Sequence, residues 1–71
     1  MDEKTLLALE QQSEAGDANA AYRIAVHYSF GVHEDAKAVV WLRRSLELGN
    51  LHACGGLVAF KATPLPDACK S

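Results

Sequence analysis

The segment 16–25, with the sequence GDANAAYRIA, decides the fold, because a related segment, GNLHACGGLV, follows at residues 49–58. A shift of 33 residues superposes the two segments and aligns their glycines, their Asp or Asn, and their small or aliphatic positions. In each copy the glycine follows a helical pattern, at the C′ position where left-handed backbone favours glycine. Asp17 or Asn50 comes next and is predicted to be the N-cap of the following helix. Both segments therefore begin with a corner between two helices.

The hydrophobic periodicity around these corners predicts four helices, over about residues 2–15, 18–30, 35–48 and 51–61. Their inward residues, spaced by three and four positions, are Thr5, Leu6, Leu9 and Ser13; Ala20, Ala21, Ile24, Ala25 and Tyr28; Ala38, Trp41, Leu42 and Ser45; and Ala53, Cys54, Leu57 and Val58. Gly55 and Gly56 weaken the fourth helix by about 1 kcal/mol each relative to alanine. Pro64 and Pro66 are expected to end all helix and leave an extended tail.

Composition supports an all-α class. The chain has 71 residues, enough for one small domain, and 12 of its apolar residues are alanine, which suits closely packed helices. Nine acidic residues against seven basic ones give a net charge of −2, without the basic excess that binds nucleic acid or an anionic membrane. We therefore expect neither of these partners.

The sequence contains no signal of export. Its first residues are acidic where a signal peptide is basic, and its longest apolar run is too short to span a bilayer. Two cysteines are too few for the disulfide framework of a secreted mini-protein. The sequence thus predicts a cytoplasmic protein.

Helical pairs that recur every thirty-odd residues predict a short, two-layer α-solenoid of antiparallel helices in residues 1–61. Residues 62–71 are expected to be a capping tail that folds back and places Leu65 against Leu57 or Val58. Cys69 could then lie near Cys54, but the sequence does not decide whether the two residues form a disulfide. Because so short a solenoid exposes apolar edges, including Leu7 or Phe60, we also expect a homodimer.

The motif residues between Glu14 and Leu57 occur in the order Gly16-Asp17, Ala20, Tyr22-Arg23-Ile24-Ala25, Tyr28, Gly31-Val32, Asp35, Lys37-Ala38, Trp41-Leu42, Arg44, Gly49-Asn50, Ala53 and Leu57. This order resembles the Sel-1-like repeat family, a relative of tetratricopeptide repeats, with one complete repeat and a half-repeat on each side. The loop after Tyr28 is shorter than is usual in the family. Leu46 replaces the first cysteine of the disulfide found in a cysteine-rich branch of the family, so that bridge cannot form here.

The resemblance implies an adaptor or scaffold that binds other proteins and performs no chemistry. Some small bacterial helical-repeat proteins look like inhibitors or immunity proteins for toxins, and this is the alternative hypothesis. The residues themselves agree with the absence of chemistry. No serine lies in a nucleophile turn, and His27, His33, His52, Cys54 and Cys69 lack metal-ligand spacing. We expect no enzyme activity, metal or cofactor, and a buried free thiol at Cys54.

A second apolar stripe on the helix over residues 18–30 provides the candidate binding site. Tyr22, Val26 and Phe30 are spaced by four residues, almost opposite the small-residue stripe, with Asn19 and Arg23 beside them. A helix that is apolar on both sides either packs between neighbours or contacts a partner, and both interpretations stay open. These five residues are the predicted protein-binding residues.

Two other groups of residues are alternative binding sites. Trp41 is interpreted as a core anchor rather than an interface residue. Arg43, Arg44 and Glu47 are interpreted as a solvated outer face and are the next surface to test.

Overall fold

The computed structural model describes residues 2–62 and 65–69, and only the backbone of Ala68. The described residues form helices and no strand, which confirms the all-α class. In chain order the elements are α1 (Glu3–Glu14), α2 (Ala18–Val26), the π-helical turn η1 (His27–Gly31), α3 (Asp35–Glu47), α4 (Ala53–Ala59) and the 3₁₀ turn η2 (Asp67–Cys69).

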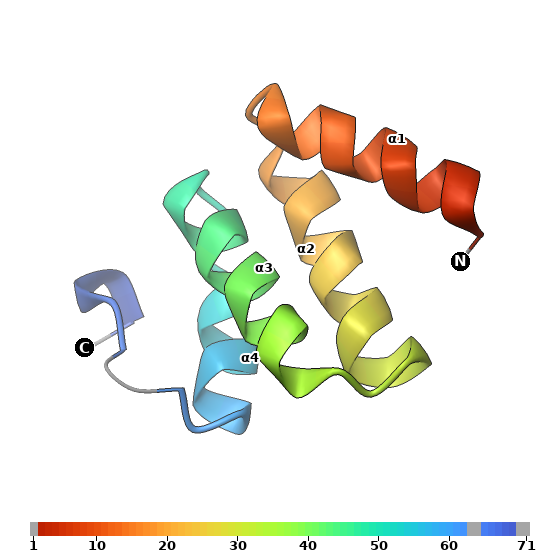
Figure 1. Cartoon of the computed structure of the whole chain (residues 1–71). Coiled ribbons are helices and arrows are strands. Elements are labelled where there is room, and N and C mark those ends of the chain that lie inside the picture. Colours follow the sequence, from red (N-terminus) through yellow and green to blue (C-terminus); the bar gives the residue numbers. More distant parts are fainter. Residues whose placement is uncertain (1, 63–64, 70–71) are drawn as a thin grey trace.

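Each α-helix packs mainly against the next one in the sequence. Figure 1 shows α1 above α2 and α2 beside α3, and α4 packs against α3. The Cα atoms span 37 × 25 × 14 Å. Because one helix with its side chains is about 10 Å across, the molecule is at most about two helices thick and its core is thin.

Both predicted corners are present, and they have the same geometry. Gly16 and Gly49 are left-handed, with φ angles of +103° and +114°. The next amide, of Asp17 or Asn50, donates a 3.0 Å hydrogen bond to the carbonyl five residues earlier. This is the bond of a Schellman motif, which satisfies a helix-terminal carbonyl. The sequence repeat of 33 residues is therefore also a repeat of backbone structure at these corners.

The two corners differ in the helix that follows. Asp17 caps α2 as predicted, since its Oδ1 accepts hydrogen bonds from the amides of Asn19 and Ala20 at 3.0 and 3.1 Å. The prediction that Asn50 caps the fourth helix is wrong. Its Oδ1 accepts from the amide of His52 at 3.0 Å, which forms a turn, and α4 begins only at Ala53.

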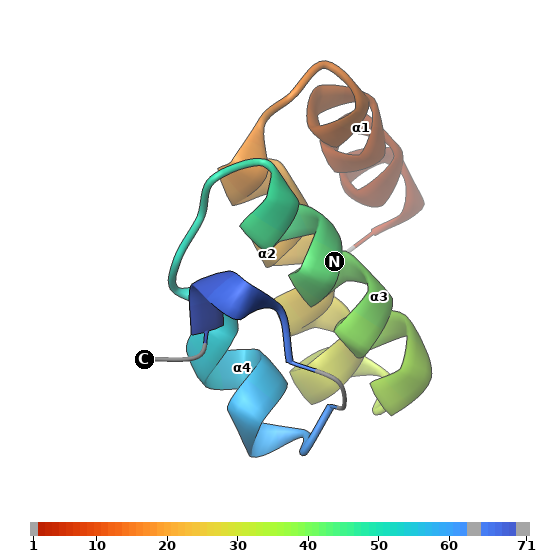
Figure 2. The ribbon, with the colours of Figure 1, turned by 90° about the vertical axis from the view of Figure 1, so that its left-hand side faces the viewer.

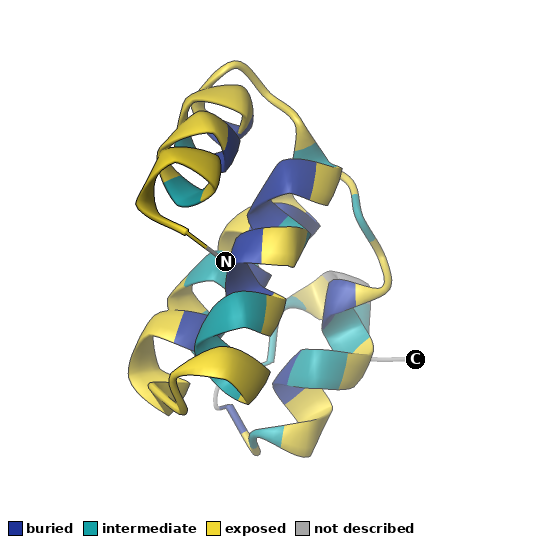
Figure 3. Ribbon diagram, turned by 90° about the vertical axis from the view of Figure 1, so that its right-hand side faces the viewer, coloured by how far each residue is buried: buried dark blue, intermediate teal, exposed yellow. Residues whose placement is uncertain are grey.

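The core consists of two clusters. Leu9, Ala20 and Ile24 form the smaller one. The larger one contains Ala25, Leu42, Leu46, Ala53, Leu57 and Ala62. Trp41 is half-buried and packs against both clusters, in agreement with its interpretation as an anchor. Figure 3 shows that buried residues are frequent on α2, whereas most of α1 is exposed.

Three predicted orientations are wrong. Val58 is 56% exposed, because Ala53 and Leu57, one turn apart, give α4 its buried face and Val58 lies beside that face. Thr5 is exposed, because it belongs to the first turn of α1, where its amide donates to Oδ1 of Asp2 at 2.9 Å. Hydrogen bonds from the side chain and backbone of Thr5 hold the pKa of Asp2 below its usual range. Arg43 is half-buried rather than fully turned to water.

The tail folds back onto α4, but not as an extended strand (Figure 2). Leu65 and Cys69 pack against the core cluster that includes Leu57 but not Val58. A direct contact between Leu65 and Leu57 stays a prediction. The prediction that no helix follows the prolines is wrong, because η2 forms and the amide of Cys69 donates to the carbonyl of Pro66 at 2.9 Å. Pro64, the other proline of this prediction, lies outside the described residues.

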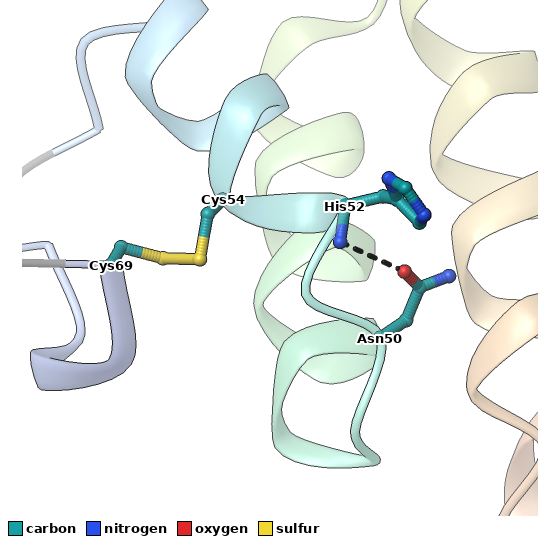
Figure 4. Close-up of a disulfide and its surroundings, with 4 residues drawn as sticks. All are labelled: Asn50, His52, Cys54 and Cys69. Atoms are coloured by element: carbon teal, nitrogen blue, oxygen red, sulfur yellow. Dashed lines mark hydrogen bonds between the residues drawn. A yellow bond between two sulfur atoms is a disulfide. The ribbon is translucent and has the colours of Figure 1, made fainter.

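Cys54 and Cys69 form a disulfide, so the prediction of a free thiol at Cys54 is wrong. Figure 4 shows the bond between α4 and η2. The two Cα atoms are 5.3 Å apart, within the usual range for a disulfide. The fold-back of the tail brings the two residues together across a sequence separation of 15.

Candidate protein-binding groove

The predicted stripe borders a hollow between α2, η1 and α4. Tyr22 is half-buried, Val26 is 36% exposed and Phe30 is 77% exposed. All three line a hollow of about 250 Å³. Its other lining residues are Ala25, Ser29, Leu42, Gly56, Ala59 and Phe60. We call this hollow the groove; one side of it belongs to α2 and η1, and the other to the end of α4.

The turn η1 shapes the first side of the groove. The predicted α-helix over residues 18–30 ends at Val26, and a wider turn follows in which the amide of Val32 donates to the carbonyl of His27 at 3.2 Å. Gly31 permits this turn, because a Cβ atom there would lie 3.1 Å from Nδ1 of His27. Since a π-turn has more residues per turn than an α-helix, it places Phe30 closer to the line of Tyr22 and Val26. Such turns occur frequently at functional sites.

A second hollow of about 450 Å³ adjoins the groove. It is lined by Arg23, Val26, His27, Phe30 and Gly31, so it shares Val26 and Phe30 with the groove. Phe30 therefore borders both hollows, whereas the exposed Arg23 lines only the second one. None of the described residues that line either hollow has a carboxylate.

Asn19 is the one predicted site residue that lies elsewhere. It lines a separate hollow made by the two corners, and its Oδ1 accepts a 3.2 Å hydrogen bond from Nδ2 of Asn50. The structure thus brings together Tyr22, Arg23, Val26 and Phe30, whereas Asn19 connects the two corners.

Sequence reasoning missed the second side of the groove. This side is lined by Gly56, Ala59 and Phe60. Of these, the sequence indicates only Phe60, as part of an apolar edge. The signal available was the apolar end of the last helix next to two glycines. That signal does not tell which other helix the segment faces.

The outer face of α3 is more polar than the groove. Val40, Arg43, Arg44, Glu47 and Leu48 line a hollow of about 480 Å³ there. The guanidinium carbon of Arg44 lies 5.6 Å from the ring centroid of Trp41, within the range of a cation–π interaction. Arg44 thus also interacts with a core residue.

Within residues 2–62 and 65–69, no three His, Cys, Asp or Glu side chains are placed so that they could hold a metal ion. Among the described helices, none has the length and apolar character needed to cross a bilayer.

No protein-family model matches the chain, and no curated protein or solved structure is significantly similar to it. The resemblance to Sel-1-like repeats therefore stays a prediction.

Proposed function

We propose that this chain is a protein–protein interaction module that holds an apolar side chain of a protein partner in the groove. The observation that carries the proposal is Phe30, which is 77% exposed beside a hollow lined by other apolar side chains. Single exposed apolar residues are ordinary, but a contiguous apolar patch with a hollow is typical of an interaction site. We also propose that the helices form a short solenoid and that the chain acts as an adaptor.

The size of the groove favours a side chain over a cofactor. At about 250 Å³, the groove is smaller than the usual pocket for a small-molecule ligand, about 300–1,000 Å³. One aromatic or aliphatic side chain fits a space of this size. Burying such a side chain contributes about 1.5–3 kcal/mol, so it would be the anchor of the interface.

The charges around the groove indicate what flanks that anchor. Arg23 is exposed and lines the adjoining hollow, and the described residues that line the two hollows include no carboxylate. A partner segment with an acidic residue next to its apolar anchor complements this surface. A charge pair at the rim mainly adds specificity and a faster association rate, while the anchor contributes most of the affinity.

A photo-crosslinking experiment tests the proposal. The photoreactive amino acid p-benzoylphenylalanine is placed at position 30, and as a matched control at position 40, because Val40 is 61% exposed on the outer face of α3. After irradiation in the native cell, the products are identified by mass spectrometry. We expect a protein that crosslinks to position 30 and not to position 40, and that is lost from pull-downs with Phe30→Ala but retained with Val40→Ala.

Several unrelated partners at position 30 would support an adaptor, and one dedicated toxin would support the alternative role of an immunity protein. Equal products from positions 30 and 40 would contradict binding in the groove. We propose the cytoplasm as the compartment. Thiols are kept reduced there, and the disulfides that do form are usually transient and redox-sensing, so the oxidised form with the Cys54–Cys69 bond would be the transient one.

A further inference from the structure

We propose that the Cys54–Cys69 disulfide is a redox switch that holds the α4 side of the groove in place. The effect of the switch on binding rests on the function proposed above. The effect on α4 stands without it.

The helix α4 has little stability of its own. It contains seven residues, whereas isolated helices shorter than about 12 residues are marginal in water. No side chain caps its N-terminus, and Gly55 and Gly56 lie in its middle. Its described packing is mainly against α3, through the buried Ala53 and Leu57. The stability of α4 therefore depends on the other residues that pack against the core cluster of Leu57.

The folded-back tail contributes to the packing of the cluster to which Leu57 belongs. Leu65 and Cys69 pack against the cluster that contains Leu57 and Ala62, and the disulfide attaches η2 to the first turn of α4 (Figure 4). The described part of the tail also contains the partly buried Leu65 and one turn of three residues. Without the covalent link, the tail is expected to separate from α4.

The same short helix forms one side of the groove. Gly56, Ala59 and Phe60 line the groove opposite Tyr22, Val26 and Phe30. If α4 frays, Phe60 moves and the groove loses that side, while Phe30 stays on η1. The position of the disulfide thus connects its oxidation state to the shape of the binding surface.

The reduction requires a dithiol. Both cysteines are partly exposed. One thiolate of the dithiol attacks a sulfur of the disulfide, forms a mixed disulfide and releases the other cysteine as a thiolate. The second thiolate of the reductant then displaces the remaining cysteine. Cys54 and Cys69 together gain two electrons and two protons, and the reductant leaves as its own disulfide.

The test uses the two phenylalanines, which lie on opposite sides of the groove. The full chain is labelled with 4-fluorophenylalanine, which gives one ¹⁹F resonance each for Phe30 and Phe60, assigned with Phe30→Leu and Phe60→Leu. Spectra and amide hydrogen exchange are recorded before and after reduction by dithiothreitol, with complete reduction verified by titration of two thiols. The Cys54→Ser/Cys69→Ser double variant is the control.

On reduction we expect the Phe60 resonance to move towards the value of an unfolded chain and the Phe30 resonance to stay. Amides of residues 53–59 should exchange at least about tenfold faster, while those of α2 and α3 keep their protection. The double variant should match the reduced protein and not respond to dithiothreitol. Unchanged resonances and exchange after full reduction, or equal loss of protection in all helices, would overturn the switch.

Binding separates the two proposals. A protein that crosslinks to position 30 is expected to bind the oxidised form at least about tenfold more tightly than the reduced form. If α4 opens on reduction and this protein still binds both forms equally, the switch in α4 stands. The placement of the binding site in the groove would then be wrong.

Discussion

The hydroxyl of Ser45 donates a 2.9 Å hydrogen bond to the backbone carbonyl of Ala18, and so connects α3 to the first residue of α2. The side chain of Ser45 is fully buried between these helices. A larger residue at this position would separate them, and an apolar residue of the same size would lose the bond. This contact fixes how α2, which carries most of the groove, lies on α3.

We predict that Ser45→Ala lowers the free energy of unfolding by about 1 kcal/mol, the usual net contribution of one hydrogen bond. The matched control is Ser29→Ala, because Ser29 makes a more exposed, local bond to the carbonyl of Val26 at 3.3 Å. The control should change stability by less than about 0.5 kcal/mol. Urea denaturation measures both values. Equal losses of stability in the two variants would mean that the hydrogen bond between α3 and α2 contributes no more than the local bond of Ser29.

The two glycines of α4 are predicted to respond oppositely to alanine. A Cβ at Gly55 meets nothing within 4 Å, so Gly55→Ala should raise stability by up to about 1 kcal/mol through helix propensity. A Cβ at Gly56 would lie 2.9 Å from both Cδ atoms of the buried Leu42. Gly56→Ala should therefore lower stability, by about 1–3 kcal/mol as for other overpacked sites.

Both variants gain the same helix propensity, so the difference between their denaturation midpoints measures the contact with Leu42. Equal midpoints would mean that Leu42 moves aside without cost, and that α4 has no need of a glycine to approach α3.

Local signals in the sequence predict the corners and the inner face of α2, because a glycine, a capping residue and a stripe of small residues act over a few positions. The start of α4 was not predicted, since Asn50 accepts from His52 in a turn rather than capping the helix. The exposure of Val58 was not predicted either, because it depends on which face of α4 meets α3.

The candidate site could be predicted only on its α2 side. The spacing of Tyr22, Val26 and Phe30 identifies that side, whereas the contribution of Phe60 depends on where α4 packs. The disulfide likewise depends on the path of the tail, which brings Cys69 to Cys54. A tertiary path of this kind leaves no periodic signal in one sequence.

Deletion of residues 63–71 is predicted to destabilise the protein. It removes Leu65 from the core cluster and also removes the disulfide, whose loop of about 15 residues contributes about 3 kcal/mol in the chain-entropy model. We expect a lower melting temperature or aggregation, measured in a Cys54→Ser background so that no free thiol remains. The full-length Cys54→Ser/Cys69→Ser protein, which also has no free thiol, separates the covalent link from tail packing. A melting temperature equal to that of the unaltered chain would refute the capping role.

Self-association is predicted for the two ends of the molecule. Leu7 on α1 is 58% exposed, while Phe60 is only partly accessible because it lines the groove. Contact between copies through α1 would cover Leu7, so Leu7→Lys should weaken it. Sedimentation equilibrium at tens of micromolar, the order of concentration for weak association, measures the mass. A monomer at that concentration would contradict the prediction.

The two aromatic residues of the α2 side are predicted to differ in their effect on folding. Phe30 is 77% exposed, so Phe30→Ala should change the free energy of unfolding by less than about 0.5 kcal/mol. Tyr22 is half-buried against the larger core cluster, so Tyr22→Ala should cost about 2 kcal/mol, roughly half the loss at a fully buried aromatic residue. Urea denaturation measures both changes in the free energy of unfolding, with Tyr22→Phe as a control that keeps the ring.

In binding to a protein that crosslinks to position 30, each alanine variant should lose about 2 kcal/mol if both residues are anchors. Titration of that protein measures the loss of binding free energy. If Phe30→Ala destabilises the chain as much as Tyr22→Ala does and binding is unchanged, Phe30 belongs to the folded core and the outer face of α3, with Arg43, Arg44 and Glu47, becomes the surface to test.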